Sequence, residues 1–130
     1  MEIYTLTISF PYDDDDIPWS KTIAVKEEFT LFELHEYIQH LVGFDNDHMF
    51  EFYIDKNPRN LRNSVSEETR LNEIYPIIGC KLFYLFDFGD SWIFQIKKSR
   101  KKIHEVKDTI YPKLIESEGA NPEQYPDYED

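Results

Sequence analysis

The sequence is poor in cysteine and in basic residues, and it has no long apolar run. Cys80 is the single cysteine in 130 residues, which excludes an intramolecular disulfide and any zinc site with several cysteine ligands. No apolar stretch approaches the roughly 20 residues of a membrane-spanning helix, and the N-terminus lacks the pattern of a signal peptide. We therefore expect a cytoplasmic protein that does not associate with a membrane.

The scarcity of positive charge limits the partners of the protein. There are 14 Lys and Arg residues against 26 Asp and Glu residues, a net charge of -12, which repels phosphate backbones and disfavours general nucleic-acid binding. A basic patch nevertheless stands out, formed by Lys97, Lys98, Arg100, Lys101 and Lys102. It indicates an acidic partner, the chain's own acidic tail or a nucleic acid, of which the tail is the simplest explanation, and a merely solvated surface is the alternative.

Aromatic residues are abundant, at 16% of the chain. Each large ring can bury on the order of 150 to 250 Å², so we expect a core rich in rings. The length predicts one domain, which we place at residues 1–115. Residues 116–130 carry six carboxylates, two prolines and no basic residue, and this composition predicts an acidic tail that is extended or partly disordered.

Alternation of apolar and polar residues predicts strands at 4–10, 19–26, 48–55 and 92–98, and an apolar run predicts a central strand at 81–87. The first two strands and the last two should each form a hairpin. The acidic run 13–16 is expected to be exposed and mobile, and residues 56–68 read as a long polar loop. Residues 69–74 can form one helical turn capped by Thr69, with Glu73 near its positive end.

Capping residues at both ends predict one main helix. Thr30 and Glu33 have the spacing of a capping box, Phe29 and Leu34 that of a hydrophobic staple, and Gly43 can end the helix in a left-handed conformation. Its apolar stripe is Leu31, Leu34, Ile38, Leu41 and Val42. The order of elements predicts an α+β fold: a β-grasp-like mixed sheet of about five strands packed on one main helix, with a long loop and an acidic C-terminal tail.

Two carboxylates, Asp87 and Asp90, bracket the predicted turn at 88–91. They could hold a cation or act as a general acid and base, but aspartates in turns more often accept backbone N–H bonds, and we favour that structural role. The four histidines do not suggest a metal site either, because no two are spaced four residues apart on one helix face. We expect His35 to be a partly buried packing residue.

Four motifs, in order, resemble the plasmid pRi open-reading-frame-three-like domain family. They are Thr30-Leu31-x-x-Leu34-His35-x-x-Ile38-Gln39, Gly43-Phe44-x-x-x-His48-x-x-x-Phe52, Thr69-Arg70-Leu71 and Tyr84-x-x-Asp87-Phe88-Gly89-Asp90-x-Trp92. The resemblance covers about residues 3–126. It implies an α+β fold with a β-grasp-like core in a largely uncharacterised family of bacterial, archaeal and plasmid-borne proteins, and it implies no established activity.

The chain also departs from that family. Members commonly have His two residues after His48 and two after Trp92, and Cys at two later positions; this chain has Phe50, Phe94, Leu114 and Asn121 there. If relatives bind a metal at these positions, the resemblance implies that this chain does not, and we predict no metal and no cofactor. The candidate site that remains is His48, Asp87, Asp90 and Trp92, with His35 and Trp19 as neighbours.

No complete nucleophile, metal or phosphate-binding set is present in the sequence. We therefore predict a non-catalytic module that binds a protein partner, with its docking site on a concave sheet face or on the 87–92 hairpin. One alternative is a small hydrolase or nucleic-acid-processing enzyme in which Asp87, Asp90 and His48 converge on a cleft. Another is a nucleic-acid-associated protein that uses the basic patch. The sequence favours no oligomeric state.

Overall fold

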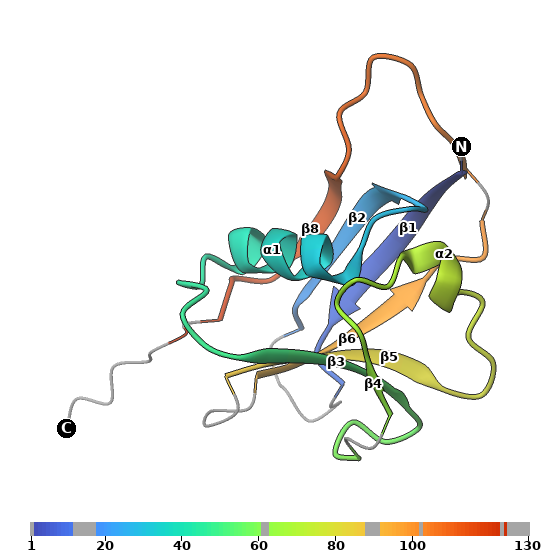
Figure 1. The fold of residues 1–130 in the computed structure, drawn as a ribbon. Coiled ribbons are helices and arrows are strands. Elements are labelled where there is room, and N and C mark those ends of the chain that lie inside the picture. The colour runs from blue at the N-terminus through green and yellow to red at the C-terminus, as the bar shows by residue number, and fades with distance from the viewer. Residues whose placement is uncertain are drawn as a thin grey trace.

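The protein is an antiparallel sheet curved around a helix (Figure 1). The computed structural model describes residues 2–11, 18–60, 63–87, 92–101, 103–122 and 124. The elements are β1 (Glu2–Ser9), β2 (Ser20–Lys26), α1 (Leu31–Val42), β3 (Phe50–Asp55), β4 (Ser64–Val65), α2 (Leu71–Ile74), β5 (Lys81–Phe86), β6 (Trp92–Lys98), β7 (Ile103–His104) and β8 (Lys113–Glu118). Neighbouring strands follow the order β4-β3-β5-β6-β1-β2-β8, and β7 also pairs with β1.

The predicted fold, a β-grasp-like mixed sheet of about five strands on one main helix, is wrong. The sheet has eight strands, all of the described pairs are antiparallel, and the two helices are short. A mixed sheet would need parallel neighbours, whereas β1 lies between β2 and β6 and runs antiparallel to both.

The strands missed by the prediction are β4, β7 and β8: the first two have only two residues each, and every residue of β8 is exposed. None of these shows the alternating burial on which strand prediction relies.

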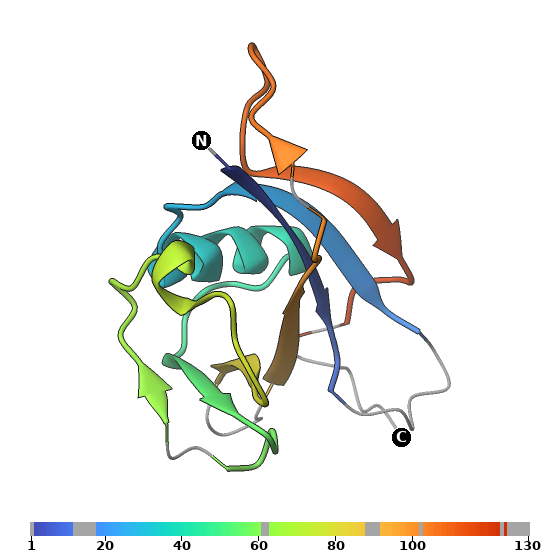
Figure 2. The same ribbon diagram turned by 90° about the vertical axis from the view of Figure 1, so that its right-hand side faces the viewer.

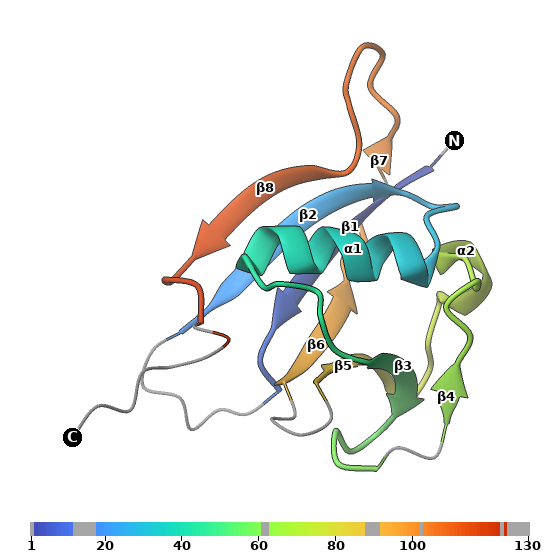
Figure 3. The same ribbon diagram turned by 60° about the vertical axis from the view of Figure 1, so that its left-hand side comes forward.

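The main helix forms as its sequence predicts. Thr30 Oγ1 accepts a hydrogen bond from the Glu33 N–H, and Glu33 Oε1 accepts one from the Thr30 N–H, each at 3.1 Å, which confirms the capping box. Gly43 follows α1 with φ +73, the left-handed conformation that glycine adopts most easily. Figure 2 and Figure 3 show how the sheet wraps around α1. The second helical turn begins one residue later than predicted, with Arg70 and not Thr69 at its N-cap.

Apolar side chains form a cluster on each face of the sheet. The larger one lies between α1 and the inner face, and the smaller one, on the outer face, contains Tyr53, Phe83, Leu85 and Ile93. Strand β5 supplies buried residues to both clusters and lies between β3 and β6, as predicted for a central strand. Each fully buried large side chain contributes about 1.5–3 kcal/mol. The loop after β3 covers Tyr53, whose hydroxyl donates to the Pro58 carbonyl at 2.5 Å.

Some predictions concern residues outside the described part of the chain. They are the acidic run 13–16, the turn at 88–91 with Asp90, and Lys102 of the basic patch. The predicted domain boundary, between residues 115 and 116, falls within β8. In the part of the chain that the structure describes, no helix is long and apolar enough to cross a membrane.

Candidate functional site

The loop between α1 and β3 holds two polar residues of the site, Asp47 and His48. Phe44, which is buried, anchors the start of this loop, because its ring packs edge-on against Trp92 with 5.1 Å between the ring centroids. Asn46 adopts a left-handed conformation, φ +54, and its N–H donates to Gln39 Oε1 of α1 at 3.1 Å. The loop is therefore tied both to the aromatic core and to the helix.

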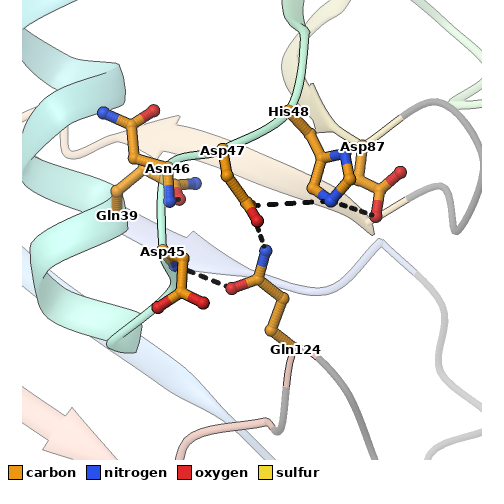
Figure 4. Close-up of polar contacts among 7 residues, drawn as sticks. All are labelled: Gln39, Asp45, Asn46, Asp47, His48, Asp87 and Gln124. Carbon is orange, nitrogen blue, oxygen red and sulfur yellow. Dashed lines mark hydrogen bonds and ion pairs between the residues drawn. The ribbon is translucent and has the colours of Figure 1, made fainter.

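His48 lies between two carboxylates (Figure 4). Its Nε2 atom is 3.5 Å from Asp47 Oδ1 and 3.6 Å from Asp87 Oδ2, distances at which a protonated imidazole forms an ion pair with each. Asp87 follows β5 in a left-handed conformation, φ +60, and its N–H donates to the Met49 carbonyl at 2.9 Å. The Asp87 side chain is 9% exposed and that of His48 is 37% exposed, so the imidazole is the part of this pair that solvent reaches.

Gln124, which is buried, joins the C-terminal segment to the same loop (Figure 4). Its Oε1 atom accepts from the Asp45 N–H at 2.7 Å, and its Nε2 atom donates to Asp47 Oδ1 at 2.9 Å. Asn121 reinforces this attachment, since its Nδ2 atom donates to the Leu41 carbonyl at 2.9 Å. Sequence reasoning missed Gln124 because nothing in its surroundings, an acidic segment with prolines, distinguishes a buried amide from a solvated one.

His35 is 2% exposed and belongs to the core, where it is even more buried than predicted. Its Nδ1 atom shares a hydrogen bond of 2.5 Å with the Tyr84 hydroxyl, which also accepts from Gln39 Nε2 at 3.0 Å. The Phe50 ring stacks on the imidazole with 3.6 Å between centroids. Burial lowers the pKa of His35, while a hydrogen bond to Asn46 and the charge of Glu36 partly oppose this effect. The arrangement suits a neutral, structural imidazole.

The two tryptophans lie apart from the His48 carboxylate pair. Trp19 is buried, packs against Phe10 and Phe94, and donates from Nε1 to Asn121 Oδ1 at 3.2 Å. Trp92 pairs with Phe86 across β5 and β6, and its buried Nε1 atom has no hydrogen-bond partner among the described residues. Of the predicted site residues, the structure thus brings His48 and Asp87 into contact and places His35 and both tryptophans in the surrounding aromatic core.

The hydrolase hypothesis requires His48 and the two aspartates to converge on a cleft. His48 and Asp87 do meet, but Asp90 lies outside the described residues, and neither of two clefts formed by described residues, of about 340 and 300 Å³, is lined by His48 or Asp87. Among the residues that the structure describes, no three His, Cys, Asp or Glu side chains are arranged to hold a metal ion. The enzyme hypothesis stays a prediction.

Most of the basic patch lines a cleft of about 300 Å³, here called the basic groove. Its cationic residues are Lys81, Lys97, Lys98 and Arg100, and its other walls include Tyr75, Pro76, Ile77, Leu82 and Ile96. Sequence reasoning missed Lys81, which joins the patch because Leu82 pairs with Ile96 and so brings Lys81 beside Lys97. Within the described part of the chain, none of the four cationic groups forms an ion pair.

The chain is similar in sequence to a known protein family and in structure to a solved protein. The family model described as plasmid pRiA4b ORF-3-like protein matches residues 2–126. The chain belongs to this family. The pRiA4b ORF-3-like fold is shared by a crystal structure of a protein of unknown function, MM3350, from Methanosarcina mazei Go1: the TM-score is 0.76 at 23% sequence identity, over 95% of this chain and 74% of that chain. No curated protein matches the chain significantly.

The four positions at which the chain departs from the family pattern have packing or bonding roles. Phe50 stacks on His35, and Phe94 stacks between Phe10 and Tyr84 in the core. Asn121 bridges Trp19 and the end of α1, as described above, whereas Leu114 lies on the exposed strand β8. Whether other pRiA4b ORF-3-like proteins hold a metal at these positions stays a hypothesis.

Proposed function

We propose that this protein is a non-catalytic interaction module that binds an extended, acidic segment of a partner protein in the basic groove. The observation that carries the proposal is the gathering of four cationic groups around one cleft, without an ion-pair partner in the described residues, on a chain whose net charge is -12. Complementary charge of this kind guides association and selects partners. The chain has a single cysteine, which fits a reducing compartment, and we propose that the protein works in the cytoplasm.

The composition of the groove favours a peptide over a nucleic acid. Single-stranded nucleic acids are held by exposed rings on which bases stack. Tyr4, beside the groove, is instead 7% exposed, and the Lys98 ammonium lies 4.6 Å from its ring centroid. Tyr75 packs edge-on against Tyr4, and its hydroxyl donates to the Ile96 carbonyl at 3.3 Å. The groove therefore offers cations and mainly aliphatic walls, with the Tyr75 ring held by its own packing, and these match alternating acidic and apolar side chains.

Fluorescence anisotropy with a short labelled peptide of alternating glutamate and leucine tests the proposal. The double variant Lys97→Glu/Arg100→Glu should bind the peptide about tenfold more weakly or worse, because two attractive pairs become repulsive. Lys56→Glu/Lys107→Glu, which changes two exposed lysines elsewhere by the same total charge, should bind almost as wild type does. Equal weakening in both variants would reduce the effect to net charge and refute the site.

A labelled single-stranded oligonucleotide serves as the second probe. We expect little binding, because the acidic surface repels phosphates. Tight, steeply salt-dependent binding that is lost in Lys97→Glu/Arg100→Glu would instead identify the groove as a nucleic-acid site.

A further inference from the structure

Strand β8 forms one end of the sheet. It pairs with β2 on one side, and no described strand lies on its other side. All six of its residues are exposed. An edge strand of this length presents a row of backbone N–H and C=O groups that can pair with a further strand.

Exposed apolar side chains are concentrated beside this edge. Of the seven large apolar residues that are exposed in the described part of the chain, four lie between residues 106 and 115: Val106, Ile110, Leu114 and Ile115. The segment that carries the first two projects from the body of the protein between β7 and β8 (Figure 1). Directly before β8, Pro112 helps to line a cleft of about 340 Å³ with Phe29, Phe32 and Tyr37. Apolar surface gathered in this way marks an interaction site.

The charges of β8 match those of a second copy in one orientation. When Lys113–Glu118 pairs with itself antiparallel about a two-fold axis, Lys113 lies opposite Glu118 of the partner and Leu114 opposite the partner's Ser117, and both pairs occur twice. A parallel arrangement would place Lys113, Glu116 and Glu118 opposite their own copies, and like charges directly opposite are destabilising.

The same strand discriminates against other pairings. Its two carboxylates repel acidic strands that bring no lysine opposite Glu118, as a second copy does. We propose that β8 is a homodimer interface, through which two copies of this chain join their sheets antiparallel and cover the apolar surface around Leu114 and Ile115. This interface is separate from the basic groove and does not depend on the function proposed for it.

Sedimentation velocity over a range of protein concentrations tests the interface. Wild type should show a dimer that grows with concentration, more so at moderate salt, which screens the long-range repulsion between two acidic chains. Glu118→Lys or Lys113→Glu should each weaken dimerisation about tenfold, because two symmetry-related ion pairs become like-charge contacts. The swap Lys113→Glu/Glu118→Lys keeps the net charge and restores the opposite pairs, so it should restore the dimer.

Two results would overturn the proposal. One is a monomer at every concentration tested, and the other is a dimer that neither single variant changes, since that dimer would use another surface. Lys97→Glu/Arg100→Glu serves as the independent control: it should leave the dimer intact. Both changed positions in β8 are exposed and form no ion pair in the described residues, so the variants should fold.

Discussion

Replacing Gln124 with alanine should measure how strongly the C-terminal segment holds the loop that carries Asp47 and His48. Among the described residues, the change removes two hydrogen bonds, from the Asp45 N–H at 2.7 Å and to Asp47 Oδ1 at 2.9 Å. Because Asp45 is exposed and the Asp47 side chain is 45% exposed, water can replace Gln124 at both groups, so no full desolvation penalty applies. At about 0.5–1.5 kcal/mol for each bond, we expect a loss of about 1–3 kcal/mol in the free energy of unfolding.

Urea unfolding, followed by tryptophan fluorescence, gives this quantity. With a dependence of about 2 kcal/mol per molar urea, the midpoint should fall by roughly 0.5–1.5 M. Gln124→Glu keeps the acceptor for the Asp45 N–H but places a second carboxylate against Asp47, which costs about 1 kcal/mol more even at the dielectric constant of water. Asn72→Ala, which removes an exposed amide, is the matched control and should leave the midpoint unchanged. If Gln124→Ala unfolds like wild type, or if the glutamate variant is as stable as wild type, Gln124 does not anchor the loop and the reasoning is refuted.

Two further predictions concern the buried hydrogen-bond network around His35. Tyr84→Phe should lower the free energy of unfolding by about 2–4 kcal/mol, because it leaves the buried His35 Nδ1 and Gln39 Nε2 atoms without their partner, whereas Tyr37→Phe, at a ring on the surface of α1, should cost far less in the same assay. Burial lowers the pKa of His35 below 6.5, so below that pH the unfolded chain binds more protons at this residue than the folded protein does, and stability should fall as the pH drops from 7 toward 5. His35→Gln should flatten this dependence, and an unchanged slope would show that His35 does not cause it.

The sequence predicted the elements that carry strong local signals. Thr30, Glu33 and Gly43 determine the ends of α1 through contacts a few residues apart, and the alternation of Tyr4, Leu6 and Ile8 marks a half-buried strand. The order of the strands in the sheet could not be predicted, because the residues of β1 and β6 do not specify which strand pairs with each of them. A two-residue strand such as β4 is too short to show a period at all.

Only part of the candidate site could likewise be predicted from the sequence. A family motif predicts His48 and Asp87 as site residues, and they do meet, with 3.6 Å between His48 Nε2 and Asp87 Oδ2. The contact of Gln124 with Asp47 joins residues 77 apart in sequence, and only the path of the chain after β8 creates it. Lys81 likewise joins the basic groove through strand pairing. Contacts between residues far apart in sequence depend on the order of the strands, and local sequence patterns do not predict that order.

The pairing of β2 with β8 has a consequence for synthesis of the chain. Lys21, whose ammonium bonds to the Ser117 hydroxyl, is translated 96 residues before that serine. At a translation rate of about 5–20 residues per second, β8 is synthesised roughly 5 to 20 seconds after β2. During that interval the run Ile23, Ala24 and Val25 has one uncovered flank, to which a neighbouring nascent chain can add. Pairing with β8 covers this flank once residues 113–118 have emerged, and it leaves β8 in turn as the edge of the sheet.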